Sequence, residues 1–235
     1  MSESIADRLA RVRQTVAEAA LRSGRRPEDV LIIGVTKTVP LVLIEEAWAA
    51  GLQHFGENRV QEAEEKITAW RAAHPERQAT WHLIGHLQTN KARTAVSLFE
   101  MIQSIDSLRV AEAVSRRAVQ AGRTVPVLLE VNVGGEPTKY GFHPDAVIEA
   151  AGQVARLPGL RIVGLMTVAP LVADPEAVRP VFRRLRELRD RLQIHYPSIP
   201  WQHLSMGMTN DYVVAIEEGA TMVRLGRAIF GERPA

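Results

Sequence analysis

Short apolar runs alternate with longer helix-like segments along this chain of 235 residues, and this alternation limits the folds open to it. Eight runs have strand character: 31–36, 53–56, 81–85, 100–104, 125–132, 160–166, 201–204 and 222–226. Helix composition and periodicity occur between them at 41–50, 60–72, 108–121, 144–156, 175–193 and 211–218. Eight βα units without a linker or a shift in composition predict one α/β domain over residues 1–235, a (β/α)8 TIM barrel.

One further helix is predicted before the first strand. Apolar residues recur at helical spacing from Ile5 to Ala20, and Ser4 with Asp7 has the form of a capping box. An open doubly wound sheet is the alternative architecture, because the second and seventh runs are short and polar. No Gly-x-Gly-x-x-Gly follows the first run, so a dinucleotide-binding sheet is not supported.

Composition excludes several classes of protein. There is no cysteine, so disulfides and thiolate sites are absent and a reducing compartment fits. The 29 basic and 27 acidic residues are interspersed, and even the arginine-rich segment 175–193 keeps an apolar stripe, so a nucleic-acid partner is not expected. No apolar stretch reaches the roughly 20 residues of a membrane span, and residues 1–25 lack a signal-peptide core. We expect an unprocessed cytoplasmic protein that does not contact membranes.

Lys37 stands at the end of the first apolar run, after Val30 to Thr36. A buried strand that stops there would place an amine at the mouth of the core. Desolvation lowers the proton affinity of a lysine and makes it a nucleophile toward aldehydes. The alternative is an ordinary lysine that extends to solvent from a strand end.

The runs at 201–204 and 222–226 are followed by glycine and hydroxyl residues, in Ser205 to Asp211 and Arg224 to Gly231. Barrel enzymes often bind phosphate in these two loops. Arg224 shares a strand face with Met222 and Gly226, so its guanidinium would meet a ligand phosphate, a ligand ring nitrogen or a carboxylate such as Glu57. An amine opposite a phosphate site suits pyridoxal 5'-phosphate, and it also suits the phosphosugar of a Schiff-base aldolase.

Other polar residues have ordinary explanations. His82 and His86 are four residues apart, which on a strand is about 13 Å and too far to share a metal ion. His203 is expected to be a hydrogen-bonded barrel histidine. Asp106 and Glu57 suit acid–base chemistry, but their spacing does not pair them.

Five motifs closely resemble the pyridoxal phosphate homeostasis proteins, the YggS/PROSC family. They are Gly34-Val35-Thr36-Lys37, Phe55-Gly56-Glu57-Asn58, Trp81 to Lys91, Leu204-Ser205-Met206-Gly207-Met208 and Arg224 to Gly231. The resemblance implies a barrel like the N-terminal domain of alanine racemase, with Lys37 as the aldimine lysine. It also implies that Asn58 faces the ring oxygen, that Met166 lies near the ring, and that the phosphate is bound by Ser205, Met206, Arg224, Gly226 and Arg227. The loop from Gly134 to Gly141 departs from the family pattern, because it is richer in glycine.

The same resemblance implies a binder of pyridoxal phosphate that takes part in its intracellular homeostasis, without established catalytic turnover. The chain ends at Ala235, so we expect it to lack the second, β-rich domain that gives alanine racemase a tyrosine base. The cofactor would then be open to solvent on one side. We expect a monomer that passes the cofactor to apo-enzymes. The alternative is a small racemase or lyase dependent on pyridoxal phosphate, with Asp106 or a lysine of the loop from Gly134 to Gly141 as its second base.

Overall fold

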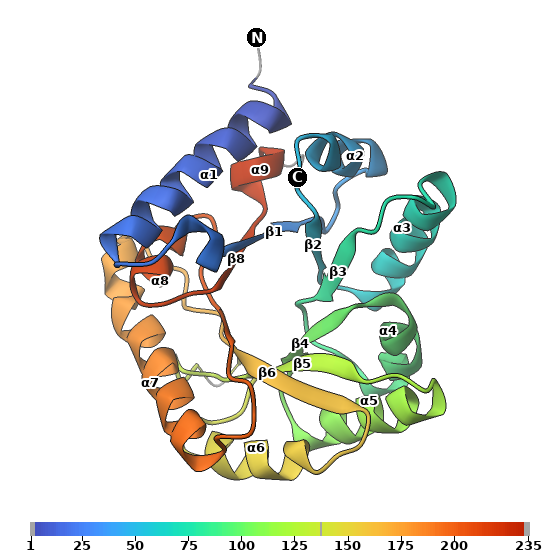
Figure 1. Ribbon diagram of the computed structural model, residues 1–235, viewed down its shortest axis with the longest axis vertical. Coiled ribbons are helices and arrows are strands. Elements are labelled where there is room, and N and C mark those ends of the chain that lie inside the picture. Colours follow the sequence, from blue (N-terminus) through green and yellow to red (C-terminus); the bar gives the residue numbers. More distant parts are fainter. Residues whose placement is uncertain (1–2, 137, 233–235) are drawn as a thin grey trace.

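Eight parallel strands form a closed barrel in this computed structural model, which describes residues 3–136 and 138–232. The strands are β1 (Leu31–Val35), β2 (His54–Glu57), β3 (Thr80–Leu83), β4 (Met101–Ile105), β5 (Val125–Glu130), β6 (Leu160–Met166), β7 (His203–Ser205) and β8 (Met222–Leu225). Each strand pairs with the next in sequence, and β1 closes the ring by pairing with β8 from Leu31↔Met222 to Gly34↔Leu225. The predicted (β/α)8 barrel is confirmed (Figure 1).

Helices surround the barrel, as Figure 1 shows. They are α1 (Ile5–Arg22), α2 (Leu41–Ala49), α3 (Val60–Ala73), α4 (Ala92–Leu98), α5 (Leu108–Gln120), α6 (Val147–Ala155), α7 (Arg179–His195), α8 (Tyr212–Glu217) and α9 (Arg227–Phe230). Short 3-10 turns occur at η1 (Pro27–Asp29), η2 (Thr89–Lys91) and η3 (Pro175–Val178). The leading helix α1 begins with the predicted capping box of Ser4 and Asp7, and it packs on α8 and α9.

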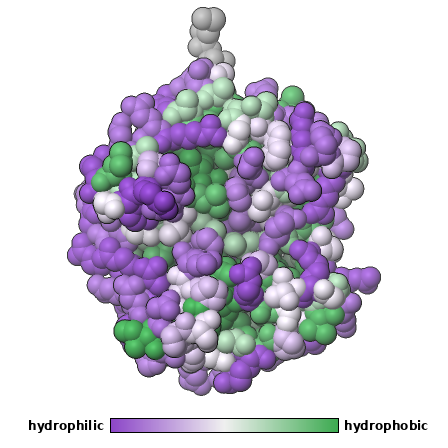
Figure 2. All heavy atoms as spheres, viewed as in Figure 1, coloured by the Kyte–Doolittle hydropathy of each residue, from purple (hydrophilic) through white to green (hydrophobic). Residues whose placement is uncertain are grey.

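The core has two layers, as expected when strand side chains alternate in direction. The larger layer lies between strands and helices and includes an aromatic cluster in which Trp70 contacts Trp48, Phe55 and Trp81. The smaller layer fills the barrel with Ile33, Leu128, Val163, Met166 and Met222. The outer rim is largely hydrophilic, with hydrophobic residues visible mainly toward the middle of the face in Figure 2.

The structure differs from the sequence prediction in an unpredicted helix and at helix boundaries. The helix α4 was not predicted, because its seven residues include Thr94, Val96 and Ser97, which favour helix weakly and here rely on packing of Ala92, Ala95 and Val96. The predicted helix at 175–193 is divided, since α7 begins one residue before Pro180. In the described part of the chain, no helix is both long and apolar enough to cross a membrane.

Candidate functional site

Lys37 lies in a tight turn directly after β1. The Val39 backbone N–H donates to the Thr36 carbonyl oxygen at 2.9 Å, which closes the turn around Lys37 and Thr38. The side chain of Lys37 is exposed, so of the two alternatives the structure favours a lysine that extends to solvent from the strand end. The amine borders a pocket at the same end of the barrel.

This pocket, which we call the β1–β8 pocket, has a volume of about 380 Å³. Its polar lining includes Lys37, Thr209, Asn210, Arg224, Gly226 and Arg227. Three cationic side chains therefore face one space with hydroxyl and amide groups, although the carboxylates of Asp211 and Glu232 also line it. Such a donor set suits a ligand that carries a phosphate and an amine-reactive group.

The loop after β7 has a fixed shape on the pocket's edge. The Met208 N–H donates to the Asp211 carboxylate at 2.6 Å, and burial raises the pKa of Asp211 above its ordinary value. Gly207 has a φ of +94°, and a Cβ there would lie 2.6 Å from the Cβ of Ala215, so only glycine suits this position. Arg227 Nη2 lies 3.4 Å from Asn210 Oδ1 and thereby links the loops after β7 and β8.

Arg224 points from β8 into the barrel, where it is 4% exposed. It donates to Ser205 Oγ at 2.6 Å and to the Thr167 carbonyl oxygen at 2.8 Å. Ser205 in turn donates to Gln103 Oε1 at 2.6 Å, so its hydroxyl proton is already in use. Burial lowers the pKa of Arg224 to about 10, with Glu130 and Asp211 opposing the shift.

Glu57 is not the partner of Arg224, which corrects one of the three alternatives for that guanidinium. The fully buried Glu57 Oε1 instead accepts from Thr36 Oγ1 at 2.6 Å and from Lys66 Nζ at 2.7 Å. Burial raises the pKa of Glu57, while Lys66 and Thr36 act in the opposite direction. Through its hydrogen bond with Thr36, Glu57 stabilises the turn that carries Lys37.

Glu130 at the end of β5 is one of two carboxylates, with Asp211, whose charge influences Arg224. It is 8% exposed, and burial together with the nearby Asp106 raises its pKa to about 7, while Arg224 has the opposite effect. A carboxyl group that titrates near neutrality at a barrel mouth is suited to proton transfer.

A second hollow of about 550 Å³ is lined by Asn58, His86, Lys91 and Tyr140. His86 Nδ1 lies 2.6 Å from Asp106 Oδ2, and the His86 ring stacks on Tyr140 with centroids 3.7 Å apart. Asp106 and Glu57, which their spacing did not pair, have different partners: Asp106 lies beside His86, and Glu57 binds Thr36 and Lys66. Asn58 does not line the β1–β8 pocket.

The histidines of β2 and β3 form a separate buried group. His82 Nε2 lies 3.1 Å from His54 Nδ1, and His82 Nδ1 lies 3.1 Å from Gln103 Nε2. Burial lowers the pKa of His82 to about 3, so the ring is neutral. The strand β3 ends at Leu83, so His86 lies outside it and the strand-based distance between His82 and His86 does not apply. No cluster of three metal-ligating side chains occurs among residues 3–136 and 138–232.

The predicted site residues divide into three groups. Lys37, Arg224, Gly226 and Arg227 line the β1–β8 pocket, and Asn58 lines the second hollow. Met166, Ser205 and Met206 are fully buried. Thr209 and Asn210 belong to the predicted phosphate loop from Ser205 to Asp211. Lys66 was not predicted, and its spacing of one helical turn from Glu62 was the available signal.

Some known proteins are similar to this chain in sequence, and others share only its fold. The model of the family "Alanine racemase, N-terminal domain" matches residues 8–234. A pyridoxal phosphate homeostasis protein of Aquifex aeolicus is 44% identical over 227 residues, which are 97% of each chain. The protein of that name from Escherichia coli K12 is 40% identical, again over 97% of each chain.

Among solved structures, PipY of Synechococcus elongatus with pyridoxal phosphate bound has a TM-score of 0.83 and 38% identity, over 97% of this chain and 100% of that one. An alanine racemase of Clostridium difficile has a TM-score of 0.71 at 16% identity, over 94% of this chain and 56% of that one. The second likeness is one of fold alone.

Proposed function

Because this chain belongs to the pyridoxal phosphate homeostasis proteins, within the wider family of alanine racemase N-terminal domains, we propose that it binds pyridoxal 5'-phosphate through Lys37 and takes part in the homeostasis of that cofactor. One observation carries this proposal. The Lys37 amine borders the same pocket as Arg224 and Arg227, together with Thr209 and Asn210.

The residues of the β1–β8 pocket fit the chemistry of this cofactor. Among the described residues, Lys37 is the one lysine that lines it, and it would bind the aldehyde carbon, with loss of water. Arg227, Gly226 and the loop after β7 would hold the phosphate, and Arg224 would face the ring from inside the barrel. When bound, the cofactor supplies an electron sink for carbanion chemistry.

The remaining predicted contact residues lie outside the β1–β8 pocket. Met166 belongs to the barrel interior and would pack below the ring. The hydroxyl proton of Ser205 is engaged by Gln103, and the Met206 backbone N–H donates to the Met222 carbonyl oxygen at 3.1 Å, so both donors would have to exchange partners to bind the phosphate. Asn58 would reach the cofactor from the direction of the second hollow.

We further propose that the protein holds and releases the cofactor without catalytic turnover, as a cytoplasmic monomer that supplies apo-enzymes. The exposure of Lys37 supports exchange, because water and incoming amines reach an exposed lysine directly. A lysine enclosed in a closed active site would exchange its ligand more slowly.

The direct test is to add pyridoxal phosphate to the purified protein, follow its visible absorption, reduce with borohydride and map the modified peptide. We expect one pyridoxal adduct, on Lys37, and no adduct there in Lys37→Ala, whereas Lys91→Ala should behave as wild type. A protein that takes up no pyridoxal phosphate, or that is modified equally at all lysines, would overturn the proposal. Trapping of a phosphosugar in place of pyridoxal would favour an aldolase.

A small enzyme dependent on pyridoxal phosphate is the second candidate, and the pair of His86 and Asp106 favours it. The carboxylate orients the imidazole at 2.6 Å, which is how general bases are commonly held. Exchange of the amino-acid α-proton with deuterated solvent, abolished in His86→Asn, would support turnover. Its absence across a panel of amino acids would remove this candidate.

A further inference from the structure

A largely buried lysine on a neighbouring helix holds the turn that carries Lys37. Lys66 extends from α3, and its side chain is 10% exposed. Its Nζ atom donates to the Thr36 carbonyl oxygen at 2.6 Å, to Glu57 Oε1 at 2.7 Å and to Glu62 Oε1 at 3.0 Å. An ammonium group has three protons, so each of them has an acceptor here.

These contacts reach the backbone on both sides of Lys37. On one side, Lys66 binds the carbonyl oxygen of Thr36. On the other, Glu62 accepts a hydrogen bond from the backbone N–H of Thr38 at 2.5 Å. Because Lys66 also binds Glu62, one ammonium group joins both anchors of the turn.

The turn needs such support because its backbone is unfavourable. Thr38 has a φ of +59°, and it occupies the third position of the turn, where a type II turn favours glycine. A β-branched residue rarely adopts this conformation, and it persists only where surrounding contacts impose it. The Thr38 side chain is exposed, so packing of that side chain does not impose it.

From this geometry we propose that Lys66 is a positioning residue for Lys37. It fixes the turn from Thr36 to Val39 and so keeps the Lys37 amine at the β1–β8 pocket; the inference rests on the proposed function of that amine. When the ammonium is removed, the turn relaxes and fewer molecules present Lys37 to an incoming aldehyde. Capture of the cofactor then slows in proportion to the competent fraction.

The experiment compares Lys66→Met, Lys66→Arg and Glu62→Ala with wild type, and uses Glu65→Ala on the exposed face of α3 as the matched control. The readouts are the rate of pyridoxal phosphate uptake, the pH at which the bound chromophore changes colour, and the fraction of borohydride adduct on Lys37. We expect Lys66→Met and Glu62→Ala to capture the cofactor at least about fivefold more slowly and to shift the colour change. Lys66→Arg should recover part of the rate, and Glu65→Ala should match wild type.

Lys66→Met leaves Glu57 buried without its cation, so that variant can fail to fold. Glu62→Ala keeps the Lys66–Glu57 ion pair, and it therefore tests the same inference without leaving Glu57 unpaired. Adding Thr38→Gly to Glu62→Ala should restore the capture rate, because glycine adopts a positive φ without strain. A wild-type rate and colour change in folded Glu62→Ala would overturn the inference. A wild-type protein that forms no adduct on Lys37 would instead overturn the proposed function.

Discussion

The guanidinium of Arg224 lies 2.6 Å from Ser205 Oγ inside the barrel, and its second nitrogen lies 2.8 Å from the Thr167 carbonyl oxygen. This arrangement joins β8 to β7 and to the segment after β6. One side chain therefore lines the β1–β8 pocket and also satisfies buried acceptors beneath it.

Arg224→Lys should destabilise the protein although it preserves the charge. A lysine ammonium cannot reproduce the planar fork that reaches Ser205 and Thr167 together, so one buried acceptor loses its partner. We expect the free energy of unfolding to fall by about 1–3 kcal/mol in urea titrations. The matched control is Arg116→Lys, which changes an exposed arginine of α5. Equal loss in both variants would contradict a special role for Arg224.

Arg227→Ala should weaken cofactor binding through the phosphate alone. Arg227 is exposed at the pocket's edge, and its side-chain contacts with the described residues are long, 3.4 Å to Asn210 and 3.8 Å to Glu232, so its removal should leave stability nearly unchanged. We expect affinity for pyridoxal phosphate to fall about tenfold, which corresponds to about 1.4 kcal/mol. Pyridoxal, which lacks the phosphate, provides the comparison in equilibrium titrations. A similar loss for both compounds would place Arg227 away from the phosphate.

The strand count and the resemblance predicted the barrel, the family and the position of Lys37 directly after the first strand, and the first two are confirmed. Local pattern was sufficient for the barrel because apolar runs and their spacing are local properties, whereas the family was predicted from the resemblance of five motifs. Contacts between residues far apart in the sequence could not be predicted from local pattern. Glu57 binds Lys66 because the fold brings β2 beside α3. Asp106 contacts His86 because the segments that follow β3 and β4 lie side by side. The exposure of Lys37 likewise depends on the positive φ of Thr38, and a threonine in the sequence does not predict that conformation.

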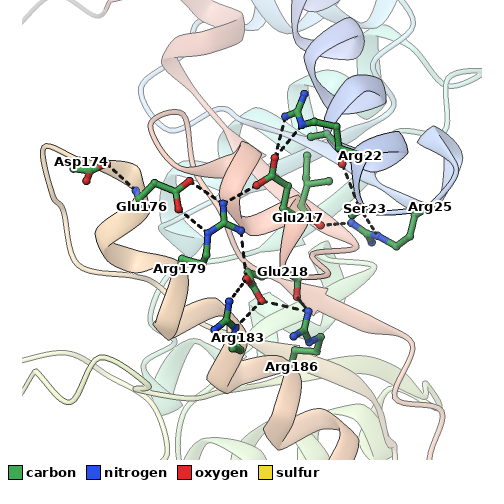
Figure 3. A network of polar contacts seen from close by, with 12 residues as sticks. Arg22, Ser23, Arg25, Asp174, Glu176, Arg179, Arg183, Arg186, Glu217 and Glu218 are labelled. Atoms are coloured by element: carbon green, nitrogen blue, oxygen red, sulfur yellow. Dashed lines mark hydrogen bonds and ion pairs between the residues drawn. The ribbon is translucent and has the colours of Figure 1, made fainter.

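A network of charged residues joins α1, α7 and the end of α8 outside the barrel. Figure 3 shows Glu218 facing Arg179, Arg183 and Arg186 of α7, while Glu217 binds Arg22 of α1 and Arg179. Glu218 is the most enclosed of these groups, with 6% of its side chain exposed. Burial raises its pKa, but hydrogen bonds from Arg183 and Arg179 outweigh that effect and leave the pKa below its ordinary value.

Glu218→Gln should lower the free energy of unfolding by about 1–3 kcal/mol at neutral pH, because three arginines lose an anionic acceptor. A carboxyl group with a lowered pKa stabilises the fold above its unfolded pKa, and this contribution disappears as pH falls through the folded value. Wild type and variant should therefore converge in acid. Glu187→Gln on the exposed face of α7 is the control, and a constant difference at all pH values would contradict the electrostatic explanation.

Glu130 should make the protein less stable as pH rises from about 4.5 to about 7. Burial and Asp106 raise its pKa from 4.5 to about 7, so between these values the folded state binds more protons than the unfolded state. The free energy of unfolding then decreases with increasing pH, by about 3 kcal/mol for a difference of this size.

Glu130→Gln should remove this dependence, because glutamine occupies similar space without a proton to release. In urea titrations at about pH 5 and about pH 8, we expect the variant to gain stability relative to wild type at the higher pH. Glu149→Gln on the exposed side of α6 should keep the wild-type slope. Parallel curves for wild type and Glu130→Gln would mean that Glu130 ionises at an ordinary pKa, and its assignment as a near-neutral proton donor beside Arg224 would then be wrong.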